Sequence, residues 1–253
     1  MFTDVLMKEE RYFYVPQANT LRELPEEEAT HALRVLRLKE GDDFVLMDGE
    51  GTFYRTVISI ITGKHCYYEI QETIPQDRCW NGHLHLAIAP TKMMERIEWL
   101  AEKATEVGFD ELSFLNCRFS ERRVVKTSRI EKIIVAAMKQ SRNAWKPVVN
   151  EIQDFQSFIA EHSKGERYIA HCYEEVPRVN LFQELSKNFS QSDCPSPLVL
   201  IGPEGDFSID EVRMAVNSGF VSVDLGKSRL RTETAGLTAV MIMQLALQKN
   251  QKI

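Results

Sequence analysis

The stretch PLVLIGPEGDFSIDEVRMAVNSGFVSVDLG, residues 197–226, decides the fold of this chain. Its apolar run Leu198–Ile201 predicts a buried strand, which ends in the glycine- and proline-rich turn Gly202–Gly205. Ser208, followed three residues later by Glu211, predicts a capping box at the start of a helix. A second apolar run, FVSVDLG, then follows. The order strand, turn, helix, strand is typical of a parallel sheet covered by helices.

The same alternation runs through the chain from Leu84 onward. We therefore predict an α/β domain over residues 82–253, with a mostly parallel sheet and helices on both of its faces. In such open sheets the ligand binds outside the carboxyl ends of the strands. The pairs of strand and helix are LHLAIAP before MERIEWLAEKATEV, ELSFLNC before RIEKIIVAAMKQS, RYIAHC before LFQELSKNF, and FVSVDLG before a last helix that begins near Thr232.

From Arg11 to about Ile74 the pattern is different, with short β-rich runs separated by turn residues. The runs are YFYV, DFVLMD, TFYRTVISII and HCYYEIQ. One helix is predicted to begin near Pro25, because three glutamates occupy its first turn and Ala29, Leu33 and Leu36 fall on one face. These features predict a small β-barrel with one helix, joined to the second domain by a linker at residues 74–82.

The overall composition is that of a globular enzyme, with 43% hydrophobic and 27% charged residues. No apolar run is long enough to span a membrane and the first residues lack a signal-peptide pattern, so we expect a cytosolic protein. The five cysteines are scattered and form no CxxC pair, which favours reduced thiols. His83 and His85 share a strand face but have no partner cluster, so we expect no metal.

The charge is unevenly distributed along the chain. The net charge of −6 argues against a protein that coats nucleic acid without sequence preference. Between Arg118 and Lys146, however, nine basic residues stand beside two acidic ones, which gives this segment +7 and leaves −13 on the rest. The segment is a candidate phosphate-binding surface. The alternative is a solvated helix face whose charges pair with acidic neighbours.

A second turn, LGKSRLRTETAGL at residues 225–237, follows the last predicted strand. We expect this turn and Gly202–Gly205 to follow neighbouring strands, with the glycines permitting positive φ and close approach of the backbone to a ligand. Arg231 precedes a helix start, where a cation opposes the helix dipole, so its position suggests anion binding. No Walker lysine and no GxGxxG pattern is present, so neither a P-loop nor a dinucleotide-binding turn is supported.

Together, IGPEG and LRTETA resemble motifs of the RsmE family of ribosomal RNA small-subunit (uridine-N3) methyltransferases, which belongs to the SPOUT superfamily. The resemblance covers almost the whole chain. RYFYV, HALRVLRLKEGD and DGEG are similar to the family's PUA-like RNA-binding domain, and EKATEVG, SERRVV and QSRNAWKP follow in the family's order.

The resemblance implies that residues 1–75 form a PUA-like domain and residues 82–253 a SPOUT domain with a trefoil knot, a rare exception among folds. It also implies a homodimer and a bent S-adenosylmethionine cofactor held by the two turns. By position, the cofactor-binding residues would be Ile201, Gly202, Pro203, Glu204, Gly205, Leu225, Gly226, Ser228, Leu230, Arg231, Thr234 and Ala235.

The sequence departs from the family pattern at two places. Asp206 stands where a second glycine is usual, and we expect the turn to survive because Asp tolerates left-handed backbone. Ser228 and Arg229 stand where the family has arginine and then an aliphatic residue, which leaves Arg229 and Arg231 as alternatives for facing the substrate. We favour Arg231, because it holds the motif position.

Methylation at uridine N3 requires loss of a proton, which leaves negative charge on O2 and O4. Arg231 is suited to stabilise that charge, and Glu233 or Glu204 could accept the proton. The alternative role for Glu233 is stabilisation of the helix start. By the same resemblance, the RNA backbone would be held by Arg11, Arg34, Arg37, Arg118, Arg122, Arg123 and Arg142.

Two other functions stay open at this stage. One is a ribosome-assembly factor that binds RNA without catalysis, and the other is an α/β enzyme that uses a different nucleotide. Binding of S-adenosylmethionine would separate the three hypotheses.

Overall fold

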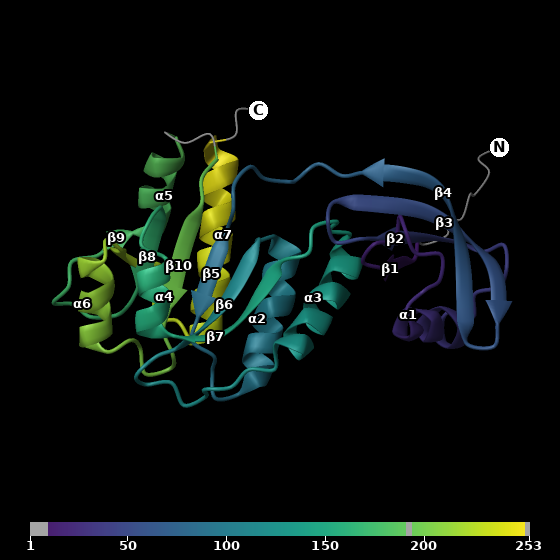
Figure 1. Cartoon of the computed structure of the whole chain (residues 1–253). Coiled ribbons are helices and arrows are strands. Elements are labelled where there is room, and N and C mark those ends of the chain that lie inside the picture. Colours follow the sequence, from purple (N-terminus) through teal and green to yellow (C-terminus); the bar gives the residue numbers. More distant parts are fainter. Residues whose placement is uncertain (1–9, 191–193, 251–253) are drawn as a thin grey trace. The chain divides into compact units, whose positions relative to one another are not determined.

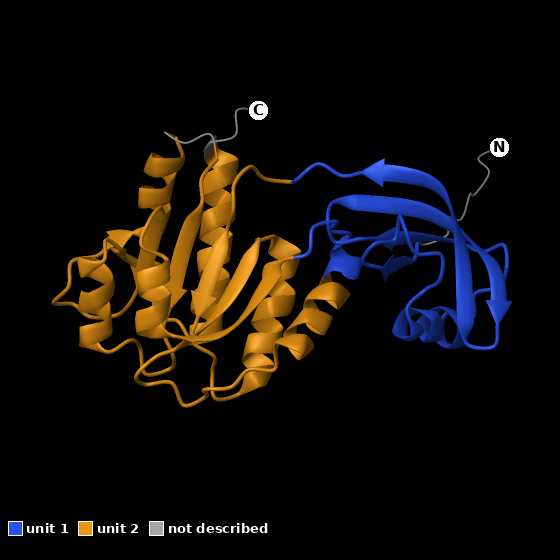
Figure 2. Cartoon of the chain, viewed as in Figure 1, with its two compact units in different colours: residues 1–78, 138–146 blue, residues 79–137, 147–253 orange. Residues whose placement is uncertain are grey.

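The computed structural model describes residues 10–190 and 194–250 of the chain, which is drawn in Figure 1. The chain divides into two compact units, coloured separately in Figure 2. Residues 1–78 and 138–146 make up the first unit, and residues 79–137 and 147–253 make up the second.

The first unit is built on a four-stranded sheet. Its strands are β1 (Tyr12–Tyr14), β2 (Asp43–Met47), β3 (Thr52–Thr62) and β4 (His65–Pro75), in the spatial order β1-β2-β3-β4. β1 is parallel to β2, and the other two pairs are antiparallel. The four strands predicted from the β-rich runs are therefore confirmed.

The predicted helix of the first unit begins directly after Pro25. It consists of α1 (Glu26–Thr30), which continues into a turn of π-helix, η1 (His31–Val35). Ala29 is buried in the core of the unit, and Leu33 and Leu36 pack against that core as half-buried residues. The apolar face read from the sequence is thus the face that packs on the sheet.

A segment distant in sequence completes the first unit. Lys139 Nζ lies 2.8 Å from Glu28 Oε1, and the backbone N–H of Lys146 donates to the carbonyl of Gly49 at 2.8 Å. A Cβ on Gly51, whose φ is +96°, would lie 2.1 Å from the Trp145 ring. Residues 138–146 therefore need the glycine turn DGEG as their packing partner, a contact that the sequence pattern did not indicate.

The second unit contains a seven-stranded sheet in which every pair of neighbours is parallel. The predicted mostly parallel sheet is confirmed. Its spatial order is β7-β6-β5-β10-β8-β11-β9. The strands are β5 (His85–Ile88), β6 (Glu111–Asn116), β7 (Val148–Asp154), β8 (Glu166–Ala170), β9 (Val179–Asn180), β10 (Pro197–Ile201) and β11 (Val221–Asp224).

Helices cover both faces of this sheet, as Figure 1 shows. Phe158 of α4 and Val212 of α6 share one buried cluster with Leu200 of β10. On the other face α7 packs against α2 and α5, and a Cβ on Gly236 would lie 2.9 Å from Leu100 and 3.0 Å from Ile88. The helices are α2 (Met94–Val107), α3 (Thr127–Ser141), α4 (Phe155–Glu161), α5 (Leu181–Phe189), α6 (Ile209–Asn217) and α7 (Thr232–Asn250).

Within residues 197–226, the helix begins where the sequence predicts it. α6 begins after Ser208, whose side chain and that of Glu211 form the predicted capping box. The expectation that β10 and β11 are neighbours is wrong, because β8 lies between them and pairs with both. The trefoil knot stays a prediction.

Three simpler expectations concern the whole chain. The five cysteines are free thiols. Within residues 10–190 and 194–250, no helix is both long and apolar enough to cross a membrane. The same part of the chain contains no group of three or more metal-ligating side chains; His83 Nε2 instead lies 2.7 Å from Glu111 Oε2, and His85 Nε2 lies 2.8 Å from Ser113 Oγ.

Candidate active site

A pocket of about 1010 Å³ lies where β8, β10 and β11 end. It brings together the two turns that the sequence singled out, although their strands are not adjacent. Of the cofactor residues expected from the resemblance, the lining includes Ile201, Gly202, Pro203, Glu204, Leu225, Gly226, Ser228, Leu230, Arg231 and Ala235. Gly205 and Thr234 are not part of the lining.

The two glycines of the first turn have different roles. A Cβ on Gly202 would lie 2.9 Å from the backbone nitrogen of Phe207, so a side chain cannot be accommodated there without moving the turn. A Cβ on Gly205 would make ordinary contact with the Phe119 side chain, 3.4 Å from its Cβ. Positive φ occurs at neither glycine but at Asp206, where φ is +67°. The expectation that Asp206 tolerates left-handed backbone is confirmed.

The Asp206 carboxylate links two parts of the pocket wall. Its Oδ1 accepts the backbone N–H of Phe207 at 2.8 Å, which stabilises the turn. Its Oδ2 accepts the backbone N–H of Cys172 at 2.8 Å, directly after β8. A glycine at this position has no side chain to accept either hydrogen bond. Asp206, which departs from the family pattern, therefore adds a hydrogen bond that connects the turn to the end of β8.

His171, at the end of β8, is a pocket residue that the sequence analysis missed. Its Nδ1 accepts the backbone N–H of Tyr173 at 3.2 Å, and burial lowers the pKa of its imidazole. The ring is therefore neutral at pH 7 with its proton on Nε2. That Nε2 is buried without a hydrogen-bond partner in the described structure. The strand RYIAHC is the sequence signal for this residue, and its end falls in the pocket because β8 lies between β10 and β11.

The second turn carries exposed cations toward the start of α7. Gly226 has φ +119°, and its N–H donates to Asp224 Oδ1 at 3.0 Å. Arg229 and Arg231 are both exposed and line the pocket. In the described part of the chain, the Arg231 side chain makes no hydrogen bond and no ion pair, so its guanidinium is available to a ligand.

The two candidate carboxylates differ in their surroundings. Glu204 is exposed, lines the pocket and accepts the backbone N–H of Lys92 at 2.9 Å. Glu233 is 7% exposed and lies outside the lining, in the first turn of α7. Its Oε1 is 3.6 Å from Arg96 Nη1, and its Oε2 has no partner among the described residues. Arg96 lines the pocket and was also missed, because it lies on α2, far away in sequence.

The arginines expected to hold RNA occur in both units. Arg34 and Arg37 are exposed in the first unit, and the Arg142 guanidinium lies 5.5 Å from the Tyr12 ring. Arg11 belongs to the same unit and is half-buried.

The other three arginines lie between β6 and α3 in the second unit. Arg118 pairs with Asp210 at 3.2 Å, Arg122 donates to the carbonyl of Lys92, and Arg123 is exposed. Some side chains of the basic segment therefore pair with acids, as in the alternative interpretation of a solvated helix face, and others are exposed.

The comparisons with known proteins agree with this geometry. A family model described as an RNA methyltransferase domain matches residues 78–244, and one described as an RNA methyltransferase PUA domain matches residues 24–71. The class defined by fold, pocket and matches is an RNA methyltransferase with an N-terminal PUA domain.

Individual relatives give a finer assignment. A ribosomal RNA small subunit methyltransferase E from Synechocystis sp. is 31% identical, over 85% of this chain and 70% of its own length. The crystal structure of a probable rRNA methyltransferase from Porphyromonas gingivalis is 39% identical, with a TM-score of 0.86, covering 95% of this chain and 100% of its own. A putative methyltransferase from Legionella pneumophila, solved with bound SAM, is 25% identical with a TM-score of 0.78, covering 94% and 98%. The chain belongs to the ribosomal RNA small subunit methyltransferase E family, which confirms the resemblance seen in the sequence.

Proposed function

We propose that this chain methylates N3 of a uridine in the ribosomal RNA of the small subunit, with S-adenosylmethionine as the methyl donor. The observation that carries this proposal is the pocket at the ends of β8, β10 and β11, where the two turns meet. Relatives named as methyltransferases of this RNA, and a neighbour solved with SAM, support it.

The residues of the pocket fit this cofactor. Ile201, Leu225 and Leu230 supply apolar surface for the adenine ring. The absence of a side chain at Gly202 allows the turn to pack closely on the backbone of Phe207, which shapes this part of the pocket wall. The unpartnered Nε2–H of His171 is a buried donor that a ligand acceptor would satisfy. When bound, the cofactor supplies a methyl group activated on a sulfonium.

The protein's part in the reaction is alignment and control of charge. Arg231, exposed at the pocket, stabilises negative charge that develops on the uracil oxygens when N3 loses its proton. Glu204 borders the pocket and is the carboxylate that we propose as proton acceptor. Glu233 was the other candidate, but its burial and its contact with Arg96 favour a role in holding α7 and Arg96 in place.

RNA binding is divided between the domains in this proposal. Residues 1–75 act as a PUA-like RNA-binding domain, and residues 82–253 act as the methyltransferase domain with a knotted cofactor site. Their exposed arginines contact phosphates, which dominate the affinity for RNA. An enzyme with this substrate works in the cytoplasm.

We also infer a homodimer. Most of the apolar stretch AVMIMQLAL on α7 is buried, including Val240 and Met243, which are both 0% exposed. Met241 and Leu245, by contrast, are 46% and 51% exposed and lie four residues apart on one side of the helix. A second copy of the chain would cover this side. Light scattering should give twice the chain mass for the wild type and a lower mass for Leu245→Asp.

A two-part experiment tests the proposed function. Calorimetric titration with S-adenosylmethionine should show micromolar-range binding, and mass mapping of small-subunit ribosomal RNA after incubation should show a methyl group on a uridine N3. RNA binding without cofactor binding would instead favour a non-catalytic assembly factor. Preference for a nucleoside phosphate over S-adenosylmethionine would favour an enzyme of another class.

A further inference from the structure

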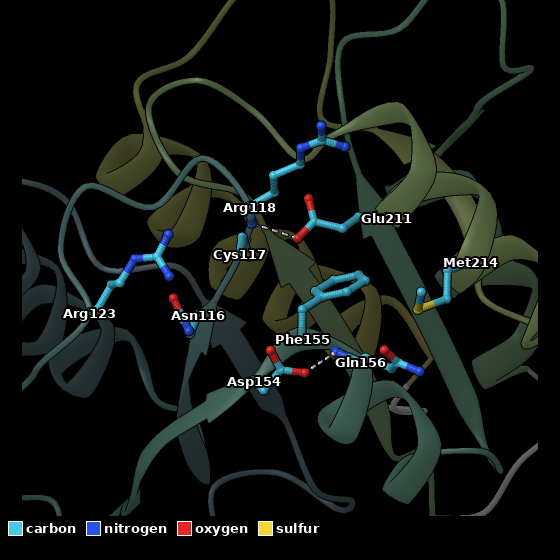
Figure 3. A pocket seen from close by; sticks show the side chains of 9 residues that line it. All are labelled: Asn116, Cys117, Arg118, Arg123, Asp154, Phe155, Gln156, Glu211 and Met214. Atoms are coloured by element: carbon cyan, nitrogen blue, oxygen red, sulfur yellow. Dashed lines mark hydrogen bonds between the residues drawn. The ribbon is translucent and has the colours of Figure 1, made fainter.

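A second pocket, of about 250 Å³, lies in the second unit at the carboxyl ends of β6 and β7. Figure 3 shows Asn116 and Arg123 on one side of it and Met214 on the other, with the Phe155 ring between them. The complete lining is Asn116, Cys117, Arg118, Arg123, Asp154, Phe155, Gln156, Glu211 and Met214. The resemblance assigns two of these residues, Arg118 and Arg123, to the RNA backbone and gives the other lining residues no role.

The carboxylates of the pocket are largely engaged within the protein. Glu211 accepts the backbone N–H of Arg118 at 2.8 Å and that of Ser208 at 2.7 Å, one on each oxygen. Asp154 Oδ1 accepts backbone N–H groups at the start of α4. Two acids also balance the two arginines of the lining, so the pocket lacks the net positive charge that would hold a free phosphate.

The groups that remain for a ligand are of two opposite kinds. Asn116 Oδ1 is a buried acceptor without a partner in the described structure, and leaving it unpaired is costly. Figure 3 shows that the Asn116 amide points toward the guanidinium of Arg123, which is a donor. A ligand that satisfies both must present a donor and an acceptor side by side. A phosphodiester of the RNA backbone presents acceptors only, whereas the Watson–Crick edge of every nucleobase presents both kinds.

The apolar lining suits the same ligand. Phe155 and Met214 offer surface against which a planar base can pack. Arg118 lies at the pocket as well and pairs with Asp210 outside it, through a contact in which both side chains are well exposed. Such an exposed pair is weak, so Arg118 can turn to a phosphate at little cost.

This pocket also adjoins the first turn of the candidate active site. Glu211 belongs to the helix that follows Gly202–Gly205, and a Cβ on Gly205 would touch Phe119, next to Arg118. An RNA strand along the carboxyl edge of the sheet can therefore reach both pockets.

We propose that this second pocket binds an unpaired nucleotide of the substrate RNA other than the one that is methylated. Asn116 and Arg123 read its base edge, Phe155 and Met214 pack on the base, and Arg118 contacts the backbone phosphate. The proposal rests on the proposed function, because it assigns a further part of the same RNA to this chain.

Direct binding tests the pocket without any methylation assay. The full-length, ¹⁵N-labelled protein is titrated with each of the four nucleoside 5′-monophosphates at millimolar concentration, and with inorganic phosphate. The side-chain amide signals of Asn116 and Gln156 are assigned through Asn116→Ala and Gln156→Ala. At least one mononucleotide should shift these signals while phosphate does not. Equal shifts with phosphate, or no shift with any mononucleotide, would overturn the proposal.

Kinetics provide the second test. Asn116→Ala should raise the KM for small-subunit ribosomal RNA by roughly tenfold, the effect of one unmade hydrogen bond in a buried site, with kcat and cofactor affinity unchanged. Ser157→Ala, on α4 but outside the lining, is the matched control and should leave KM unchanged. A folded Asn116→Ala protein with wild-type KM would contradict the proposal. Mononucleotide binding without any methylation by the wild type would overturn the proposed function alone.

Discussion

Asp206 accepts a hydrogen bond from the backbone N–H of Cys172, so one side chain joins the turn after β10 to the end of β8. The two elements are separated by more than thirty residues in sequence and form adjoining parts of one pocket wall. The same carboxylate accepts the N–H of Phe207, which fixes the turn itself. The shape of the pocket therefore depends on a residue that has left-handed backbone geometry.

Substitutions at Asp206 should separate the two contributions of this residue. Asp206→Ala loses both hydrogen bonds and places a Cβ at φ +67°, so we expect its free energy of unfolding to fall by about 2–3 kcal/mol. Asp206→Gly loses the same bonds without the backbone strain and should be less destabilised by about 1 kcal/mol. Urea unfolding measures both values. Equal losses in the two variants would show that strain plays no part.

The positions of most strands and helices in the second unit could be predicted, because buried strands such as Leu198–Ile201 are continuous apolar runs. Their spatial order could not. The crossover after β10 passes over β8 before β11 is added, and this choice depends on helix packing across the whole sheet. As a result His171, which sits between the two predicted turns, was missed.

The strand β7 and the helix α4 were missed for a different reason. β7 is an edge strand, and none of its residues is fully buried. It therefore shows neither an apolar run nor a clear alternation. α4 has only seven residues, which is too short for a helical period to stand out, although Asp154 caps it as expected of such a start. The second pocket depends on both elements and could not have been found from the sequence.

The first turn contains a matched pair of glycines for a substitution test. In Gly202→Ala the new Cβ meets the backbone nitrogen of Phe207 at 2.9 Å, so the turn must move. We expect a loss of stability of about 2 kcal/mol and at least tenfold weaker cofactor binding, because strain and a displaced pocket wall act together. Gly205→Ala should change both values little, since its Cβ makes an ordinary contact at 3.4 Å without positive φ. Calorimetry with S-adenosylmethionine measures the cofactor affinity of both variants, and thermal melting measures their stability. Equal effects in the two variants would contradict the different roles assigned to Gly202 and Gly205.

Stability should depend on pH through His85, which is 6% exposed. Burial lowers the pKa of His85 to about 4, with smaller contributions in the same direction from His162 and His83, while Glu111 opposes them. In the unfolded chain the pKa is about 6.5, so between pH 6.5 and pH 4 the unfolded state binds more protons. The contribution of His85 to the free energy of unfolding is therefore complete above pH 6.5, and it is lost as the pH falls toward 4. Between pH 7 and pH 5 the loss should be about 2 kcal/mol.

The Glu111 carboxylate extends the same trend to lower pH. The hydrogen bond from His83 is the main cause that lowers the pKa of Glu111 to about 2, so its contribution is lost as the pH falls from about 4.5 toward 2. Glu111 contributes little to the difference in urea unfolding between pH 7 and pH 5, because its carboxylate in the folded protein is ionised at both values. Burial also lowers the pKa of His171, so a His85 variant is needed to isolate the part due to His85. In His85→Gln the difference between the two pH values should shrink by most of the 2 kcal/mol; an unchanged difference would assign the pH dependence to other groups.

The last prediction concerns Arg231, which lies directly before the first residue of α7. Its guanidinium is exposed and has no partner within the described residues, and a cation at a helix start is unfavourable. Arg231→Ala should therefore change the free energy of unfolding by no more than about 0.5 kcal/mol. Single-turnover methylation should nevertheless slow by about a hundredfold, as expected when one donor to a developing oxyanion is removed, while cofactor affinity changes much less. Arg229→Ala removes the same charge from the same turn and is the matched control, with a smaller expected effect. If Arg231→Ala melts early and turns over normally, Arg231 is a structural residue, and the stabilising role passes to Arg229.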